Sequence, residues 1–126
     1  MKFDSTIEGH HIILDALPLG GGSDSGPRPK SLMLTALAGC TGMDVVSYLK
    51  KMRAKIEYFN VSVTGYLTDD FPKHYNKIHI VFELKGSNLT MDKINQAIKL
   101  SEEKYCGVWA VYRKTMEITK EVILLK

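Results

Sequence analysis

The pattern of apolar and polar positions predicts a chain of alternating strands and helices. A short apolar run at 11–14 predicts a first strand that ends before Asp15. Glycine, serine and proline crowd the segment 19–29, and this composition predicts a mobile connection. The segment lacks the lysine and serine that follow the last glycine of a phosphate-binding loop, so we do not expect it to bind phosphate.

The next segment, 29–54, predicts a long helix, with Pro29 suited to its first turn. Its apolar side chains surround the axis at about 100° per residue, and a helix that is apolar all round is buried. We therefore expect a central helix wrapped by other elements. Gly39 and Gly42 each lower helix propensity by about 1 kcal/mol relative to alanine and indicate a close approach, either of another helix or of a substrate, near Cys40.

The remaining elements are two strands, a helix and a last strand. Apolar positions alternate in 58–66 and 78–84, which predicts strands joined by a flexible tip at 69–73. A second helix is expected to be capped by Thr90 and to end at Gly107. Its core stripe consists of Ile94, Ala97, Ile98 and Ser101. A short helical stretch and a strand at 115–124 complete an α+β order within a single domain, 1–126.

Charge and composition exclude several classes of protein. The net charge is +3, and basic residues are interleaved with acidic ones rather than gathered in a stripe, so nucleic-acid binding is not expected. The longest apolar run, 32–37, is too short to span a bilayer, and no secretory leader is evident. We expect a cytoplasmic protein without membrane insertion.

The chain has two cysteines, Cys40 and Cys106, 66 positions apart. They are too few for a dense disulfide framework or for a four-ligand zinc site. Two interpretations remain open from the residues alone: buried thiols that act as small hydrophobic groups, or a redox pair. The four histidines show no ligand spacing with one another, so neither a metal nor another cofactor is expected.

Two segments resemble the signatures of one family. The run 26–41 joins a glycine-proline loop to a Leu/Ala-rich helix with Cys40 near its middle, and 101–106 carries Cys106 at the end of a second helix. In order and distance they resemble the OsmC/Ohr family (osmotically inducible / organic hydroperoxide resistance proteins), over roughly residue 15 to the C-terminus. The resemblance implies antiparallel sheets wrapped around a buried central helix in an intertwined homodimer, with active sites at the subunit interface.

The resemblance also implies a reaction for the two thiols. Cys40 would attack an organic hydroperoxide and become a sulfenic acid, and Cys106 would condense with it to a disulfide. An external dithiol would then reduce the disulfide. The implied role is a cytoplasmic stress-response peroxidase whose substrate is a small organic hydroperoxide.

The sequence departs from the peroxidase pattern near the first thiol. Peroxidase members of the family activate it with an N-terminal arginine held by a glutamate ten positions before the cysteine, where this chain has Lys30. The candidates for stabilising the Cys40 thiolate are therefore Arg28 and Arg113, or a residue of the partner subunit. Asp44, one turn after Cys40, would oppose thiolate formation if it faced the sulfur.

Aromatic residues near Cys106 are candidates for the wall of a pocket. Trp109 is expected in the core or in the pocket wall because of the apolar area it buries, and Tyr105 is expected to line the same region. The alternative to a peroxidase is an OsmC-like dimer that binds a small apolar ligand, or that uses its thiols as a redox sensor.

Overall fold

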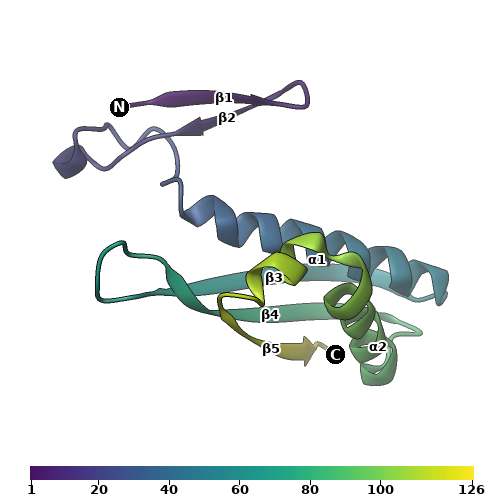
Figure 1. Cartoon of the computed structure of the whole chain (residues 1–126). Helices are drawn as coiled ribbons and strands as arrows, with labels where there is room; N and C mark the ends of the chain where they lie inside the picture. The colour runs from purple at the N-terminus through teal and green to yellow at the C-terminus, as the bar shows by residue number, and fades with distance from the viewer. The chain divides into compact units, whose positions relative to one another are not determined.

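A computed structural model describes residues 1–126 of the chain (Figure 1). The chain divides into two compact units, Met1–Leu34 and Thr35–Lys126. The first unit carries a two-stranded sheet, and the second carries a three-stranded sheet.

The first unit is built on an antiparallel hairpin of β1 (Phe3–Ile7) and β2 (His10–Leu14). Glu8 and Gly9 form its turn with φ values of 50° and 80°, which suits the twist of a two-residue hairpin. The apolar run at 11–14 correctly predicted β2. The sequence did not predict β1, because polar residues fill the middle of this strand.

Asp15 organises the segment that the composition predicted to be a mobile connection. Its carboxylate accepts hydrogen bonds from the backbone N–H groups of Ala16, Ser23 and Ser25, and from the hydroxyls of both serines, at 2.7–3.1 Å. These contacts hold the pKa of Asp15 well below its usual range, because all of them favour the charged carboxylate. The prediction of a loose connection was wrong, since five donors converge on one buried carboxylate.

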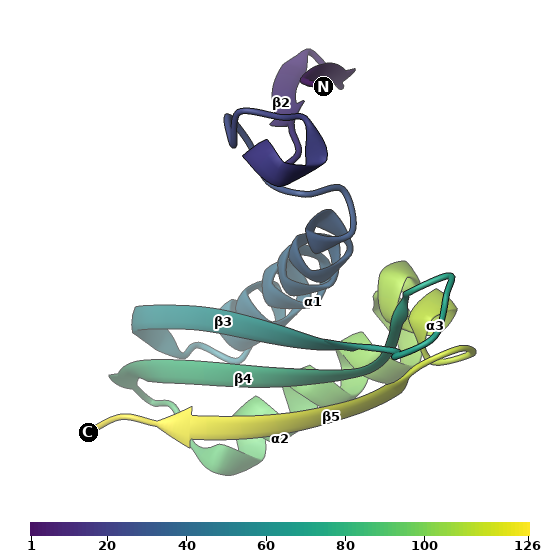
Figure 2. The same ribbon diagram turned by 90° about the vertical axis from the view of Figure 1, so that its left-hand side faces the viewer.

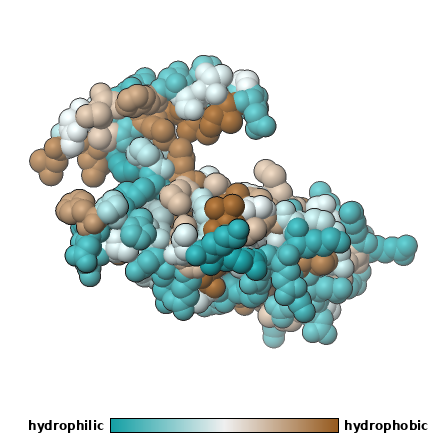
Figure 3. Space-filling view, viewed as in Figure 1, coloured by the Kyte–Doolittle hydropathy of each residue, from teal (hydrophilic) through white to brown (hydrophobic).

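The first unit exposes many of its apolar side chains. Phe3 is 67% exposed and Leu19 fully so, and Figure 3 shows apolar residues on the outside of this part of the chain. A cavity of about 450 Å³ lies within the unit, between the hairpin and the segment that follows it. A hairpin unit with so little core of its own needs further apolar surface to cover it.

The second unit contains a three-stranded sheet in the order β3 (Lys55–Leu67), β4 (Tyr75–Ser87), β5 (Glu117–Leu124). Strands β3 and β4 are antiparallel, whereas β5 runs parallel to β4. The expectation of antiparallel sheets is therefore wrong for the β4–β5 pair alone. The chain leaves β4, crosses through its helices and returns in the same direction, which is the connection that a parallel pair requires.

Helices α1 (Ser31–Lys51) and α2 (Met91–Leu100) cover the same face of this sheet (Figure 2). The alternation predicted for 78–84 is confirmed, because every second residue from Ile78 to Leu84 is fully buried. These residues are Ile78, Ile80, Phe82 and Leu84. They form the core together with apolar residues of the helices. Because such cores are closely packed, α1 and α2 are held in fixed positions on the sheet.

Helix α1 buries one face rather than its whole circumference. Leu37, Val45 and Leu49 are fully buried, but Met43 is 76% exposed. The expectation of a helix buried all round is therefore wrong for the single chain, whose sheet covers α1 from one side. The helix is long and apolar enough to cross a membrane by length and composition, a test that core helices of soluble proteins also pass.

The second helical segment has three parts. Thr90 caps α2 as predicted, accepting a hydrogen bond from the Lys93 amide at 3.2 Å. The helix then widens into a π-helical turn, η2 (Ser101–Tyr105), and a short helix, α3 (Gly107–Tyr112), follows. Gly107 begins α3 instead of ending α2, because the chain already breaks at Cys106, which adopts an extended conformation and caps α3.

Candidate thiol site

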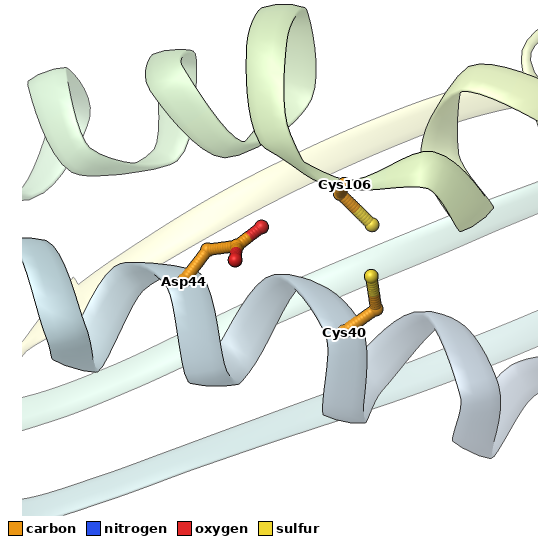
Figure 4. Close-up of side chains that lie close together, drawn as sticks. All are labelled: Cys40, Asp44 and Cys106. Atoms are coloured by element: carbon orange, nitrogen blue, oxygen red, sulfur yellow. The ribbon is translucent and has the colours of Figure 1, made fainter.

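The structure brings the two cysteines together. Cys40 on α1 and Cys106 between η2 and α3 point toward one another in Figure 4, and Asp44 lies beside them, one turn further along α1. The two sulfurs and a carboxylate oxygen of Asp44 all lie within 4.8 Å of one another. Both thiols are free, with Cys40 partly accessible and Cys106 buried. The resemblance implied that Cys40 and Cys106 are neighbours in space, and the structure places them together within one chain.

The π-helical turn sets the position of Cys106. The Cys106 amide donates to the Ser101 carbonyl at 2.8 Å, across the wider turn of a π-helix. Its sulfur accepts a hydrogen bond from the Trp109 amide at 3.3 Å, as the cap of α3. Single π-turns inside helical segments are frequent at functional sites, and this turn aims the buried sulfur at α1.

Burial strongly favours the protonated form of Cys106. The pKa of Cys106 is raised to about 12, mainly because the sulfur is removed from solvent. A hydrogen bond to the Cys40 side chain and the electrostatic interaction with Cys40 also contribute to this increase. The backbone N–H groups of Trp109 and Val108 act in the opposite direction but more weakly than burial. Cys106 is therefore a thiol, not a thiolate, at neutral pH.

A chain of hydrogen bonds holds Asp44 in place. The Ser101 hydroxyl donates to Asp44 Oδ2 at 2.9 Å and lies 2.8 Å from the Thr41 hydroxyl. A carboxylate only accepts, so the Ser101 proton points at Asp44 and Thr41 donates to Ser101. Thr41 and Ser101 are fully buried.

Thr41 and Ser101 were not predicted as members of the site from the sequence. A signal was present, since Ser101 is the polar member of the apolar stripe of the second helix. For Asp44 the sequence predicted only a condition, namely that its carboxyl group would oppose thiolate formation if it faced the Cys40 sulfur. In the structure a carboxyl oxygen of Asp44 does lie near both sulfurs, and the Ser101 hydroxyl donates a hydrogen bond to that carboxyl group.

The two arginines that the sequence suggested have other partners within the chain. Arg28, in the first unit, pairs with Asp24, and the Arg113 guanidinium donates to the Glu102 carbonyl. Arg113 and Tyr105 nevertheless line the same hollow as Cys106, a space of about 310 Å³ between η2 and α3. Their assignment as thiolate-stabilising and pocket residues stays a prediction.

Trp109 lies in the core and is 2% exposed. Its amide contacts Cys106, and the Lys120 ammonium lies 5.9 Å from the centre of its ring. Lys120 also binds the Glu102 carboxylate at 2.5 Å. Within the single chain Trp109 is thus a core residue next to Cys106, and its role in a pocket wall stays a prediction.

A second hollow runs along the other side of α1. It has a volume of about 630 Å³ and is lined by Gly39, Gly42 and Met43 of the helix and by Phe59 and Val61 of β3, among others. A methyl group added at Gly42 would contact the Val61 side chain at 3.4 Å, whereas one at Gly39 would meet no atom of this chain within 4 Å. The close approach at Gly42 is thus made by strand β3, and not by another helix or a substrate as expected.

The family model of the OsmC-like proteins matches residues 21–121. Protein YhfA of Escherichia coli K12 is 33% identical over 114 residues, which cover 90% of this chain and 82% of YhfA. The α+β fold with its cysteine pair is thus that of an OsmC-like protein. The chain belongs to the OsmC/Ohr family.

Solved structures support the same fold. A hypothetical protein from Aquifex aeolicus VF5 is 28% identical, with a TM-score of 0.82 over 99% of this chain and 89% of that one. An OsmC-like protein from Mycoplasma pneumoniae is 18% identical, with a TM-score of 0.83 over 99% and 89%. An organic hydroperoxide resistance protein from Legionella pneumophila is 13% identical, with a TM-score of 0.66 over 98% and 96%.

Proposed function

We propose that the protein is a thiol-dependent peroxidase that reduces organic hydroperoxides through Cys40 and Cys106. The observation that carries the proposal is the convergence of the two sulfurs from different elements, with one partly accessible and the other buried. An accessible thiol can meet a peroxide, and a buried thiol beside it can close a disulfide. Membership of the OsmC/Ohr family supports this chemistry, and the structural neighbour from Legionella pneumophila is named for resistance to organic hydroperoxides.

The first step takes place at Cys40. Its thiolate sulfur attacks the hydroperoxide oxygen distal to the alkyl group, and the O–O bond breaks. The alkoxide leaves with a proton as an alcohol, so that sulfur is oxidised to a sulfenic acid and the peroxide is reduced. Cys106 does not compete for the peroxide, because burial keeps it protonated.

The second step joins the two sulfurs. Cys106 attacks the Cys40 sulfenic sulfur, an S–S bond forms, and the hydroxyl group leaves with the thiol proton as water. The sulfurs already lie within 4.8 Å, so closure to a bond of about 2.05 Å requires only a local shift. An external dithiol then restores both thiols by exchange.

Activation of Cys40 requires a positive charge or several hydrogen-bond donors. Of the two candidate arginines, Arg113 is closer to Cys106 in the sequence, and both residues line the same hollow. Its guanidinium donates a hydrogen bond to the Glu102 carbonyl. We infer that Arg113, or a cation of a partner subunit, supplies this charge when substrate is bound. Arg28 remains the second candidate.

We further propose that the protein acts as a homodimer, the typical state of its family, and that it works in the cytoplasm. Two features support the dimer: the exposed apolar face of α1, and the first unit, whose apolar side chains lie at its surface. A second copy of the chain would cover both. A methyl group added at Gly39 would meet no other atom of this chain within 4 Å, which leaves space for a second copy to pack there.

Peroxide consumption with dithiothreitol as reductant tests the enzymatic proposal. Wild type is expected to consume cumene hydroperoxide faster than hydrogen peroxide, with the release of one alcohol per peroxide. Cys40→Ser should lose turnover. In the absence of dithiothreitol, Cys106→Ser should reduce one equivalent of peroxide and stop at the sulfenic acid, whereas wild type should stop at the disulfide. Full turnover by Cys40→Ser, or faster use of hydrogen peroxide, would refute the proposal.

The second candidate function is binding of a small apolar ligand. The hollow of about 630 Å³ along α1 and β3 supports it, because apolar side chains and glycines line much of its wall. Mass spectrometry of the native protein tests this function. A lipid-like molecule that co-purifies equally with wild type and Cys40→Ser would favour the ligand-binding protein over the peroxidase.

A further inference from the structure

The thiol site has the composition of a metal centre as well as that of a redox pair. Cys40, Asp44 and Cys106 contribute two sulfurs and a carboxylate oxygen that lie within 4.8 Å of one another. Thiolate and carboxylate are both ligands of Zn²⁺, and thiolates also suit Cd²⁺ and Co²⁺. From the sequence no metal site was expected, because two cysteines are too few for a four-ligand zinc site and the histidines show no ligand spacing. The structure adds Asp44 as a third donor beside the two sulfurs, and no histidine belongs to this group.

The separations of the donor atoms agree with a single ion between them. In a tetrahedral zinc site with Zn–S bonds near 2.3 Å, neighbouring donor atoms lie roughly 3.5–3.8 Å apart. Donors that are at most 4.8 Å apart need to move by about 1 Å or less to reach that arrangement. All three residues belong to the second unit, so its own packing fixes their positions.

The backbone explains why the three ligands face one point. Cys40 and Asp44 are four residues apart on α1, which places both on one face of the helix. Cys106 reaches the same point because the π-helical turn before it ends against α1 (Figure 4). Two ligands from one helix and a third from a separate segment are a common way to build a metal site.

Hydrogen bonds from the surrounding residues hold two of the three ligands. Ser101 donates to Asp44 Oδ2 at 2.9 Å, and the Trp109 amide donates to the Cys106 sulfur at 3.3 Å. Such outer contacts orient ligating groups and tune their affinity for a metal in known metalloproteins. Ser101 is itself fixed by Thr41, so the orientation of the carboxylate is determined by fully buried groups.

We propose that Cys40, Asp44 and Cys106 bind one thiophilic divalent cation of the Zn²⁺ class, with the fourth position open to water. The sulfurs bind such an ion as thiolates, so the ion competes with protons for them. Cys40 and Asp44 are partly accessible, which gives the ion a route to the site. The bound ion would block the peroxidase cycle proposed above, because both sulfurs become ligands.

Titration of the reduced protein with Co²⁺ tests the site without any peroxide. Wild type is expected to bind one ion and to show the thiolate-to-cobalt charge-transfer band and the intense visible bands of tetrahedral Co²⁺. Zn²⁺ should displace Co²⁺ and bleach these bands. The absence of a thiolate-to-cobalt charge-transfer band would overturn the proposal.

The variants separate this site from adventitious binding. Asp44→Asn and Ser101→Ala are expected to weaken Co²⁺ binding by roughly 10–100-fold, whereas Asp69→Asn, at an exposed loop position, should leave it unchanged. Oxidation of wild type to the disulfide should abolish binding, and dithiothreitol should restore it, which tests the sulfurs without a substitution that could unfold the chain. Equal affinity in Asp44→Asn and wild type would refute the three-ligand site.

The outcome does not depend on the peroxidase proposal. A chain that binds Co²⁺ through these residues but reduces no peroxide would refute only the enzymatic function. A chain that reduces cumene hydroperoxide but shows no cobalt–thiolate band would refute only the metal site.

Discussion

Ser101 in the π-helical turn and Asp44 on α1 are joined by a hydrogen bond of 2.9 Å, although 57 residues separate them in the chain. The bond connects the two elements that carry the cysteines. Its donor is fully buried and is also bonded to Thr41. The geometry of the thiol pair therefore depends on a polar contact as well as on apolar packing.

Removal of this contact should destabilise the protein. Ser101→Ala leaves the Asp44 carboxylate and the Thr41 hydroxyl without their shared partner, and an unsatisfied buried group costs about 1–3 kcal/mol. We expect a decrease of that size in the free energy of unfolding, measured by urea denaturation. Ser87→Ala, at an exposed position near the end of β4, serves as the control and should change stability by less than about 0.5 kcal/mol. Equal stability of the two variants would show that the network is not structural.

The reactivity of Cys106 should depend steeply on pH. Burial is the largest cause that raises its pKa to about 12, and burial persists when Cys40 is replaced. In Cys40→Ser the single remaining thiol should therefore react slowly with iodoacetamide at pH 7. The rate should rise about tenfold per pH unit beyond pH 9, because the thiolate is the nucleophile.

The matched variant is Cys106→Ser, in which Cys40 alone is labelled. Its partly accessible sulfur should react faster at pH 7 than Cys106 does in Cys40→Ser. A rate for Cys106 that levels off near pH 8, the behaviour of an ordinary exposed thiol, would contradict the assignment of Cys106 as the buried partner.

The sequence predicted the elements with strong apolar periodicity and the residues with distinctive chemistry. The burial of Ile78 and Phe82 on β4 and the cap at Thr90 are confirmed, since each depends on local pattern. The parallel direction of β5 was missed, because pairing direction depends on the path of the chain between strands. Burial of α1 on one face only was missed for a similar reason, since composition does not say which surfaces a single chain covers.

The candidate site was predicted in part for comparable reasons. The family resemblance implied the pairing of Cys40 with Cys106 from the sequence alone. The contact between Ser101 and Asp44 could not be predicted, because it requires the π-helical turn, and no residue type signals such a turn.

The loop that follows β2 should loosen in acid. The folded-state pKa of Asp15 lies well below the unfolded value of about 3.9, so its hydrogen bonds contribute stability that is fully present above about pH 5. This contribution is lost as the pH falls below about 4 toward the folded-state pKa. Limited proteolysis of the segment 16–26 should therefore accelerate between pH 5 and pH 3 in wild type.

Asp15→Asn supplies the comparison for this loop. A neutral amide has a single acceptor oxygen and no charge, so it cannot replace the carboxylate that accepts five hydrogen bonds. Cleavage of this variant should therefore be fast at both pH values and nearly independent of pH. Asp69→Asn should behave like wild type. A loop whose cleavage in wild type does not respond to pH over this range would contradict the role given to the Asp15 carboxylate.

The exposed face of α1 predicts how the chain assembles. Met43 is 76% exposed in the single chain and lies beside the glycines of the hollow along β3. If a second copy covers this face, Met43→Glu places an unpaired charge in an apolar interface, which costs several kcal/mol. At about 3 kcal/mol, dissociation of the dimer would become roughly 100-fold easier. Sedimentation velocity should then show a dimer for wild type and a monomer for Met43→Glu.

Met91→Glu, at the first turn of α2, introduces the same charge on another exposed methionine and should remain dimeric. A wild-type monomer, or a Met43→Glu dimer as stable as wild type, would rule out this face as the interface.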